Sequence, residues 1–169
     1  MTPECFGIAG WKNSGKTSLV AGLVEEISTR GLVVSTIKHA HHTFDLDTAG
    51  TDSFKHRKAG AHEVVLVSGK RWAIQHELAE RPEPDFWTML GKLSPCDLVL
   101  VEGYKREKIP KIEIISEATI NETRFWTEDP NVRALACDIE IAGCPLPCFP
   151  RNAYREIADF ILEQSSINS

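Results

Sequence analysis

The chain has 169 residues, of which 42% are hydrophobic and 25% charged, and its formal net charge is -5 at pH 7. This size favours one domain that buries its own core, which we expect to span residues 1–164 with a polar tail at 165–169. The acidic balance and scattered basic residues argue against a nucleic-acid partner. With no signal peptide at the N-terminus and no apolar run near the ~18 residues of a membrane span, we expect a cytoplasmic protein without a membrane partner.

The cysteine content fits that compartment. There are five cysteines, an odd number, and thiols in a reducing compartment usually stay reduced. Only Cys144 and Cys148 are closely spaced, and a structural zinc site needs four ligands. We therefore expect small buried residues or free thiols.

Residues 10–17, with the sequence GWKNSGKT, match the G-x-x-x-x-G-K-[ST] pattern of a phosphate-binding loop, or P-loop. The apolar run at 6–9 predicts a buried strand before the loop. Apolar residues at helical spacing from Leu19 to Ile27 predict an amphipathic helix after it, with its end near Gly31. A strand, a glycine-rich turn and a helix N-terminus direct several backbone N–H groups at one point, which suits a polyphosphate.

The P-loop therefore predicts a nucleoside triphosphate site. We expect Lys16 to reach the β- and γ-phosphates in a catalytic role and the Thr17 hydroxyl to bind Mg²⁺. The predicted nucleotide-binding residues are Gly10, Lys12, Asn13, Ser14, Gly15, Lys16, Thr17 and Ser18.

A polar segment at 38–47 follows a predicted second strand at 32–37. Ligands of an open α/β sheet bind beyond the carboxyl ends of its strands, so we expect this segment near the triphosphate. Asp45 is a candidate catalytic residue near Mg²⁺, and the three histidines of the segment leave transition-metal binding open. A short helix is predicted next, over 52–60. The candidate switch or anion-binding residues of both segments are Lys38, His39, His41, His42, Asp47, Asp52 and Arg57.

Residues 64–67 and 72–76 flank a short glycine turn and predict an antiparallel hairpin. We expect this hairpin to be appended to the parallel sheet, where it adds an edge. An exposed edge invites pairing with another chain, so the hairpin predicts a homodimer.

The apolar run at 98–101 predicts a strand that is buried on both faces and ends at Glu102. Its carboxyl end brings Glu102 to the same sheet edge as Thr17. P-loop enzymes need an acidic group there to hold or orient Mg²⁺ and its waters. Glu102 is therefore the second candidate metal-binding residue and a candidate catalytic residue.

The remaining apolar patterns complete the predicted fold. They predict a helix opened by Asp85, strands at 111–115 and 132–137, and a last helix capped by Asn152. The predicted fold class is an α/β P-loop NTPase, with a mostly parallel sheet flanked by helices and an added antiparallel hairpin.

These motifs together resemble a known family. The segments 10–17, 38–42, 47–53 and 97–103 are similar in order and spacing to those of the molybdopterin-guanine dinucleotide biosynthesis adaptor family, MobB. The resemblance covers the chain from about residue 6 to residue 160. The Lys-His-x-His-His segment at 38–42 is much more specific than the P-loop.

The resemblance implies a GTP-binding accessory protein that uses Mg²⁺ and hydrolyses GTP slowly in molybdenum cofactor maturation. It also implies dimerisation and two further partners, the guanylyltransferase that attaches GMP to molybdopterin, and molybdopterin or its guanine dinucleotide. The sequence has no Asn-Lys-x-Asp motif to read guanine, so the preference for GTP rests on the resemblance alone.

Two other functions stay open. The first is a small P-loop kinase, for which Arg57, Arg71 and Arg81 would be a poor arginine lid. The second is a metal-insertion GTPase that holds nickel or zinc. Its ligands would come from His39, His41, His42, Cys144 and Cys148.

Overall fold

The computed structural model describes residues 3–40, 44–165 and 167. The chain divides into two compact units, one of residues 1–39 and 86–169 and the other of residues 40–85. Two compact units can still fold as one domain, so the single domain at 1–164 stays a prediction. In the described part of the chain, no helix is long and apolar enough to cross a membrane.

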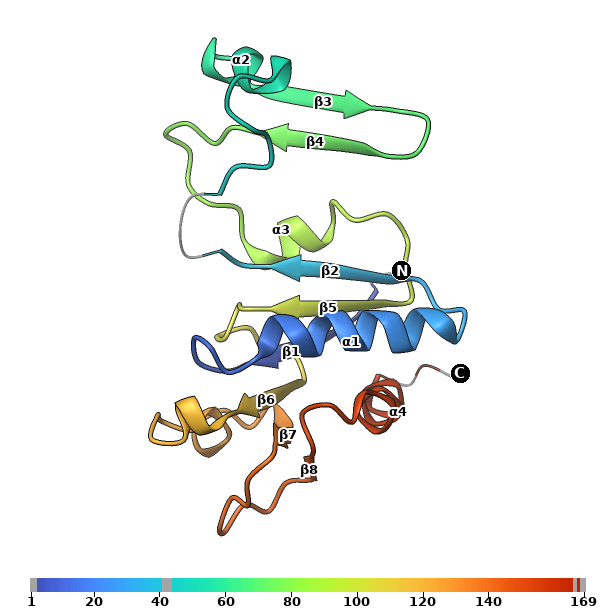
Figure 1. Cartoon of the computed structure of the whole chain (residues 1–169), viewed down its shortest axis with the longest axis vertical. Helices are drawn as coiled ribbons and strands as arrows, with labels where there is room; N and C mark the ends of the chain where they lie inside the picture. Colours follow the sequence, from blue (N-terminus) through green and yellow to red (C-terminus); the bar gives the residue numbers. More distant parts are fainter. Residues whose placement is uncertain (1–2, 41–43, 166, 168–169) are drawn as a thin grey trace. The chain divides into compact units, whose positions relative to one another are not determined.

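A six-stranded sheet forms the centre of the first unit (Figure 1). Its strands are all parallel, in the order β2-β5-β1-β6-β7-β8. Their bounds are β1 Glu4–Ala9, β2 Val34–Lys38, β5 Leu98–Glu102, β6 Lys111–Ile115, β7 Val132–Cys137 and β8 Cys148–Phe149. The parallel arrangement gathers the carboxyl ends of β1, β2 and β5 at one edge, and the predicted α/β fold class is confirmed.

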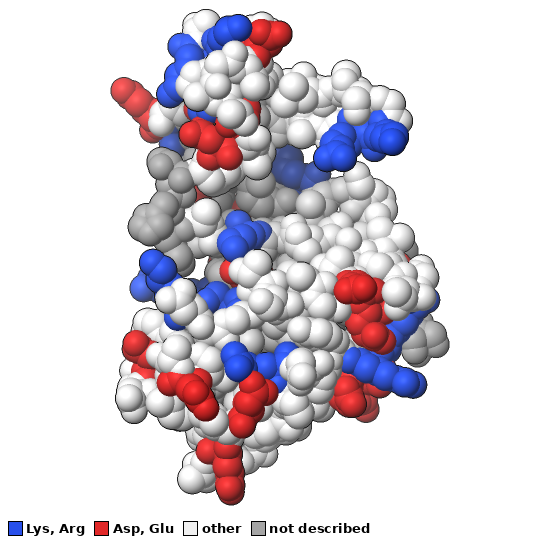
Figure 2. All heavy atoms as spheres, viewed as in Figure 1, with Lys and Arg blue, Asp and Glu red and all other residues white. Residues whose placement is uncertain are grey.

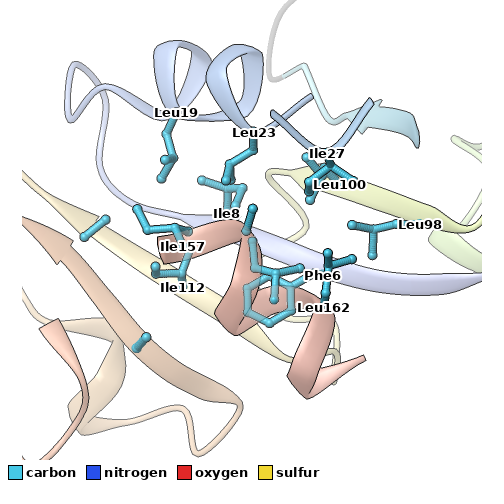
Figure 3. Close-up of a cluster of buried hydrophobic side chains, with 14 of the residues drawn as sticks. Phe6, Ile8, Leu19, Leu23, Ile27, Leu98, Leu100, Ile112, Ile157 and Leu162 are labelled. Atoms are coloured by element: carbon cyan, nitrogen blue, oxygen red, sulfur yellow. The ribbon is translucent and has the colours of Figure 1, made fainter. Parts of the chain in front are cut away.

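Helices α1, Lys16–Thr29, and α4, Tyr154–Gln164, cover one face of this sheet. Figure 3 shows their apolar side chains packed against those of β1, β5 and β6. Gly22 lets the two helices approach closely, because a Cβ there would lie 2.5 Å from the Tyr154 ring. This packing fixes α1, and with it the P-loop that precedes α1.

The predicted cap of the last helix is wrong. The N-cap of α4 is Ala153, without a side-chain hydrogen bond. Asn152 lies instead in a turn that the Ala153 N–H closes by donating to the Pro150 carbonyl. Because this turn comes first, the helix begins at Tyr154.

The other face of the sheet is covered by α3, Phe86–Leu90, whose Phe86 and Leu90 pack against Val99 and Val101. The predicted burial of β5 on both faces is therefore confirmed. Two short 3-10 helices, η1 Glu117–Thr119 and η2 Phe125–Thr127, follow β6.

The second unit contains α2, Asp52–Lys58, and a hairpin of β3, Glu63–Val67, and β4, Trp72–His76. The antiparallel hairpin was predicted, but its expected attachment to the parallel sheet is wrong. Within the described residues, β3 and β4 bond to each other and form a sheet of their own. Neither strand is therefore a member of the parallel sheet.

Candidate nucleotide-binding site

The P-loop lies between the carboxyl end of β1 and the first turn of α1, as predicted. Gly10 has a φ of 153°, and a Cβ on it would lie 2.6 Å from the Ser14 Oγ and 2.8 Å from the Ile114 carbonyl oxygen. Gly15 caps α1 with a φ of 102°, and Asn13 tolerates the left-handed region with a φ of 64°. The loop therefore needs glycine at both motif positions, one for close packing and one for its backbone conformation.

Two side chains inside the loop carry the features of an anion cradle. The Lys16 ammonium donates to the Trp11 carbonyl at 2.6 Å. Burial lowers the pKa of Lys16, the carboxylate of Glu102 opposes that shift, and the charges of Lys105 and Lys38 add to it. Ser14 is fully buried, and its Oγ has no hydrogen-bond partner among the described residues. A polyphosphate would supply both the counter-charge for the lysines and a partner for that hydroxyl.

The predicted magnesium-linked pair is brought together. The Thr17 Oγ1 lies 3.4 Å from both carboxylate oxygens of Glu102. Lys38, at the end of β2, places its Nζ 3.1 Å from the Glu102 Oε1 and 3.4 Å from the Thr17 Oγ1. Hydroxyl and carboxylate oxygens are the ligands that Mg²⁺ prefers, so this donor set fits the ion.

The adjoining ends of β2 and β5 are held together by backbone contacts. The His39 N–H donates to the Glu102 carbonyl at 2.9 Å, and the His39 ring lies 4.7 Å from the Tyr104 ring. Gly103 permits this approach, because a Cβ on it would lie 2.8 Å from the Cβ of His39. His39 is therefore packed beside the predicted site.

Some of the predicted nucleotide-binding residues are exposed to solvent. Lys12, Asn13 and Ser18 are exposed at the P-loop and the start of α1. His41 and His42 lie outside the described residues.

Two groups beside the P-loop were missed by the sequence analysis. Trp11 stacks on Phe125 at 5.3 Å between ring centroids, and the Lys105 ammonium lies 4.5 Å from the Trp11 ring and 4.8 Å from the Phe125 ring. This cation–π arrangement places another positive charge next to the loop. The only signal in the sequence was the charged segment after Glu102.

Arg151 is the second missed group. Its guanidinium is 3.5 Å from the Ser14 carbonyl, and its Nε donates to Asp138 at 2.6 Å. Hydrogen bonds from the Arg151 backbone N–H and side chain lower the pKa of Asp138. No short sequence motif predicts this contact, because it joins residues 137 positions apart.

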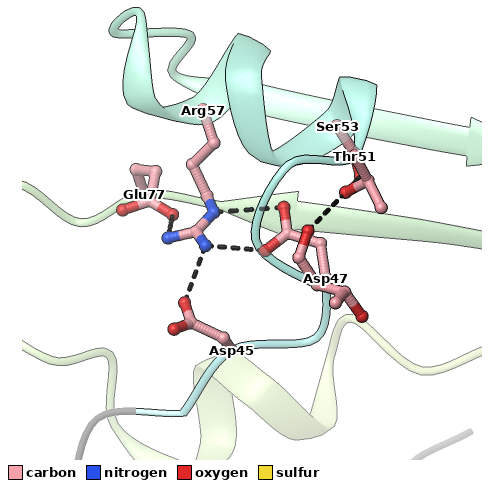
Figure 4. A network of polar contacts seen from close by, with 7 residues as sticks. Asp45, Asp47, Thr51, Ser53, Arg57 and Glu77 are labelled. Carbon is pink, nitrogen blue, oxygen red and sulfur yellow. Dashed lines mark hydrogen bonds and ion pairs between the residues drawn. The ribbon is translucent and has the colours of Figure 1, made fainter.

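The other candidate switch residues belong to the second unit, where Arg57 organises them (Figure 4). One Arg57 nitrogen lies 2.7 Å from both Asp45 and Asp47, and another lies 3.5 Å from Glu77. The hydrogen bond from Arg57 lowers the pKa of Asp47. Asp52 pairs separately with Lys55 at 3.2 Å, so Asp45 and Asp47 share one cation and Asp52 does not.

The cysteines are free thiols, as predicted. Burial, with the nearby Cys137 and Cys144, raises the pKa of Cys148 to about 11. A thiol must lose its proton to bind zinc, so this shift disfavours Cys148 as a ligand.

The charges on the visible face of the molecule are mixed. Figure 2 shows Lys and Arg side chains interspersed with Asp and Glu side chains.

A comparison with known protein families gives a match for this chain. A family model described as "Molybdopterin guanine dinucleotide synthesis protein B" matches residues 5–138, which is most of the chain. The chain belongs to this family. The resemblance drawn from the motifs is thereby confirmed.

Individual relatives agree with the family. The chain is 34% identical over 160 residues to the molybdopterin-guanine dinucleotide biosynthesis adapter protein of Escherichia coli, covering 94% of this chain and 91% of the relative. It is 42% identical over 107 residues to the protein of that name in Haemophilus influenzae, covering 63% and 60%. A solved structure of molybdopterin-guanine biosynthesis protein B has a TM-score of 0.74 and 28% identity, covering 95% of this chain and 99% of that one. The structure of Bacillus subtilis MobB, at a TM-score of 0.75 and 22% identity, covers 96% and 98% and shows the same fold.

Proposed function

We propose that this chain binds GTP with Mg²⁺ and acts as an accessory protein in the biosynthesis of molybdopterin guanine dinucleotide. The observation that carries the nucleotide assignment is the convergence of the P-loop, the Thr17 hydroxyl and the Glu102 carboxylate at one sheet edge. The choice of GTP and of the pathway rests on the family and on the named adapter relatives.

Each residue of the site has a separate task in this proposal. The backbone N–H groups at the start of α1 bind phosphate oxygens, and Lys16 offsets their negative charge. Thr17 and Glu102 hold the magnesium ion, which neutralises charge on the phosphates. The Lys38 ammonium contacts the Glu102 carboxylate and the Thr17 hydroxyl. When nucleotide binds, Lys38 can exchange its contact with Glu102 for one with a phosphate.

We further propose that hydrolysis is slow and serves to switch the adaptor. Efficient hydrolysis needs groups that orient water and offset transition-state charge, and a partner often supplies them. We therefore expect turnover by the isolated protein well below the ~1–10³ s⁻¹ typical of enzymes. The partner is the molybdenum cofactor guanylyltransferase, and the cargo at the complex is molybdopterin or its guanine dinucleotide. The five free thiols support a cytoplasmic location.

The proposal includes a homodimer formed through the hairpin. Apolar side chains of β3 and β4 are turned to solvent, with Val67 79% exposed, Trp72 67% and Val65 60%. Contiguous exposed apolar surface marks an interaction site, and a second copy would cover it in a closed, symmetric dimer.

Titration calorimetry tests the nucleotide assignment. Lys16→Ala removes the cation that faces the phosphates, and we expect GTP affinity to fall by at least about tenfold, which corresponds to ~1.4 kcal/mol. Lys92→Ala is the control, because Lys92 is an exposed lysine outside the P-loop. Equal GTP affinity in wild-type and Lys16→Ala protein would overturn the nucleotide assignment.

A further inference from the structure

Two histidines meet at the open end of the hairpin in the second unit. His62 precedes β3, and His76 is the last residue of β4. The Glu77 N–H donates to the His62 carbonyl at 3.0 Å, and the two imidazole centroids are 4.4 Å apart. The pairing of the two strands therefore fixes the distance between the rings.

One arginine, Arg81, contacts both rings. One Arg81 nitrogen, Nη2, lies 2.9 Å from the Nδ1 of His62 and 3.1 Å from the Nε2 of His76. The same nitrogen also lies 3.3 Å from the Nε2 of His62. A guanidinium has donors only, so the two rings meet at one positively charged group.

Glu63 fixes the orientation of the His76 ring. Its Oε1 lies 2.7 Å from the His76 Nδ1, and the two residues are directly paired across the strands. Because a carboxylate only accepts, the His76 Nδ1 carries a proton and donates to the Glu63 carboxylate. A carboxylate that receives the second ring N–H is the usual companion of a metal-binding histidine.

We propose that His62 and His76 bind a divalent transition-metal ion of the zinc class, with Glu63 as the carboxylate that orients His76. Ligand atoms of these three residues lie within 4.8 Å of one another. Imidazole nitrogens suit Zn²⁺, Cu²⁺ and Ni²⁺. Water completes the coordination shell, because all three residues are exposed.

Arg81 competes with the metal in this arrangement. Its guanidinium lies against the ring nitrogens that would bind the ion, so metal binding requires the exposed Arg81 side chain to turn away. The same Nη2 also lies 2.8 Å from the Glu77 carbonyl oxygen, and its two hydrogens are shared among these acceptors. The positive charge of Arg81 therefore lowers the affinity of the site for the ion.

Titration of the chelator-treated, nucleotide-free full chain with Zn²⁺ against a chromophoric chelator tests the proposal. We expect wild-type protein to bind Zn²⁺ at this site, and His62→Gln and His76→Gln each to weaken that binding by at least about tenfold. Glu63→Gln should weaken it by roughly tenfold, the lower end of what loss of such a partner costs. His56→Gln, which changes an exposed histidine of α2, should leave the affinity unchanged.

The arginine supplies the variant that separates a metal site from a structural network. Arg81→Ala removes a competing cation and keeps every proposed ligand, so it should bind Zn²⁺ several-fold more tightly than wild type. Weaker binding by Arg81→Ala would overturn the proposal. Zn²⁺ binding that is the same in wild-type protein and in the His62→Gln/His76→Gln double variant would also overturn it. GTP affinity, measured in parallel, tests the proposed nucleotide site. The outcome for GTP does not decide the outcome for Zn²⁺.

Discussion

Glu102 is the residue on which the magnesium assignment depends. It lies at the carboxyl end of β5, where its carboxylate contacts Thr17 and Lys38. Its side chain is only 12% exposed, so the carboxylate is partly desolvated. Electrostatic interactions in such an environment are stronger than in water.

Glu102→Gln removes this charge while keeping the size of the side chain. We expect GTP hydrolysis to fall by at least about tenfold, because the amide can no longer hold or orient the magnesium ion. Phosphate release under multiple turnover measures the effect. Glu25→Gln, an exposed position on α1, is the control and should hydrolyse GTP at the wild-type rate. Wild-type hydrolysis by folded Glu102→Gln protein would remove Glu102 from the site.

Asp129 and Lys111 form an ion pair that supports the segment carrying Lys105. The Lys111 Nζ lies 2.6 Å from Asp129 and also donates to the Glu107 and Lys105 carbonyls. Its side chain is 3% exposed. A charge buried in this way is costly unless its partner stays ionised.

Asp129→Asn should lower the free energy of unfolding by about 2 kcal/mol, less than the ~3–5 kcal/mol of a fully buried pair because Asp129 is partly exposed. Burial alone would raise the pKa of Asp129, but the hydrogen bonds from Lys111 and Asn131 outweigh it and lower that pKa. A lowered folded-state pKa stabilises the fold above the ordinary carboxyl range, and that contribution is lost as the pH falls towards the folded-state pKa.

Urea unfolding at pH 7 and pH 3 measures both effects. The difference between wild type and Asp129→Asn should shrink at the lower pH. Asp159→Asn is the control, because Asp159 is 60% exposed in its pair with Arg30 and should cost at most about 1 kcal/mol. A difference that is the same at both pH values would contradict this account of the pair.

The sequence was informative about site residues whose spacing is local. Lys16 and Thr17 were predicted because a motif encodes them, and Glu102 because it ends a strongly apolar strand. Arg151 reaches the P-loop only through the turn before α4. Such a contact depends on tertiary packing, which no short pattern records.

For the helices and strands too, local patterns were predictable and tertiary arrangement was not. Five strands of the parallel sheet and helix α1 were predictable from apolar periodicity, which burial enforces. The two-residue β8 is too short to show a pattern, and a local pattern does not show whether a hairpin joins the main sheet.

The exposed apolar surface of the hairpin predicts how the chain assembles. Trp72→Lys and Val67→Lys place charges on its exposed apolar surface, where β3 and β4 pair through these two residues. We expect sedimentation at micromolar concentration to give a dimer for the wild type and a monomer near 18.8 kDa for the double variant. Lys70→Ala, in the turn between the strands, is the control and should remain dimeric. A wild-type chain that sediments only as a monomer would contradict the homodimer.

In the whole molecule, one chain combines the proposed triphosphate site in the first unit with an apolar hairpin in the second. An adaptor needs both kinds of surface, one to sense a nucleotide and one to assemble. A ligand can shift the affinity for a partner only by as much as it favours one state over the other. The central claim therefore predicts that nucleotide binding and partner binding are thermodynamically coupled.

The most direct test is the affinity of this chain for the molybdenum cofactor guanylyltransferase, measured with Mg²⁺ and either GTP, ATP or no nucleotide. We expect a complex whose dissociation constant changes by at least about fivefold with GTP, the lower end of typical coupling, and less with ATP. Lys16→Ala should form the complex without that change. A dissociation constant that is identical in all three conditions, or no complex at all, would contradict the account.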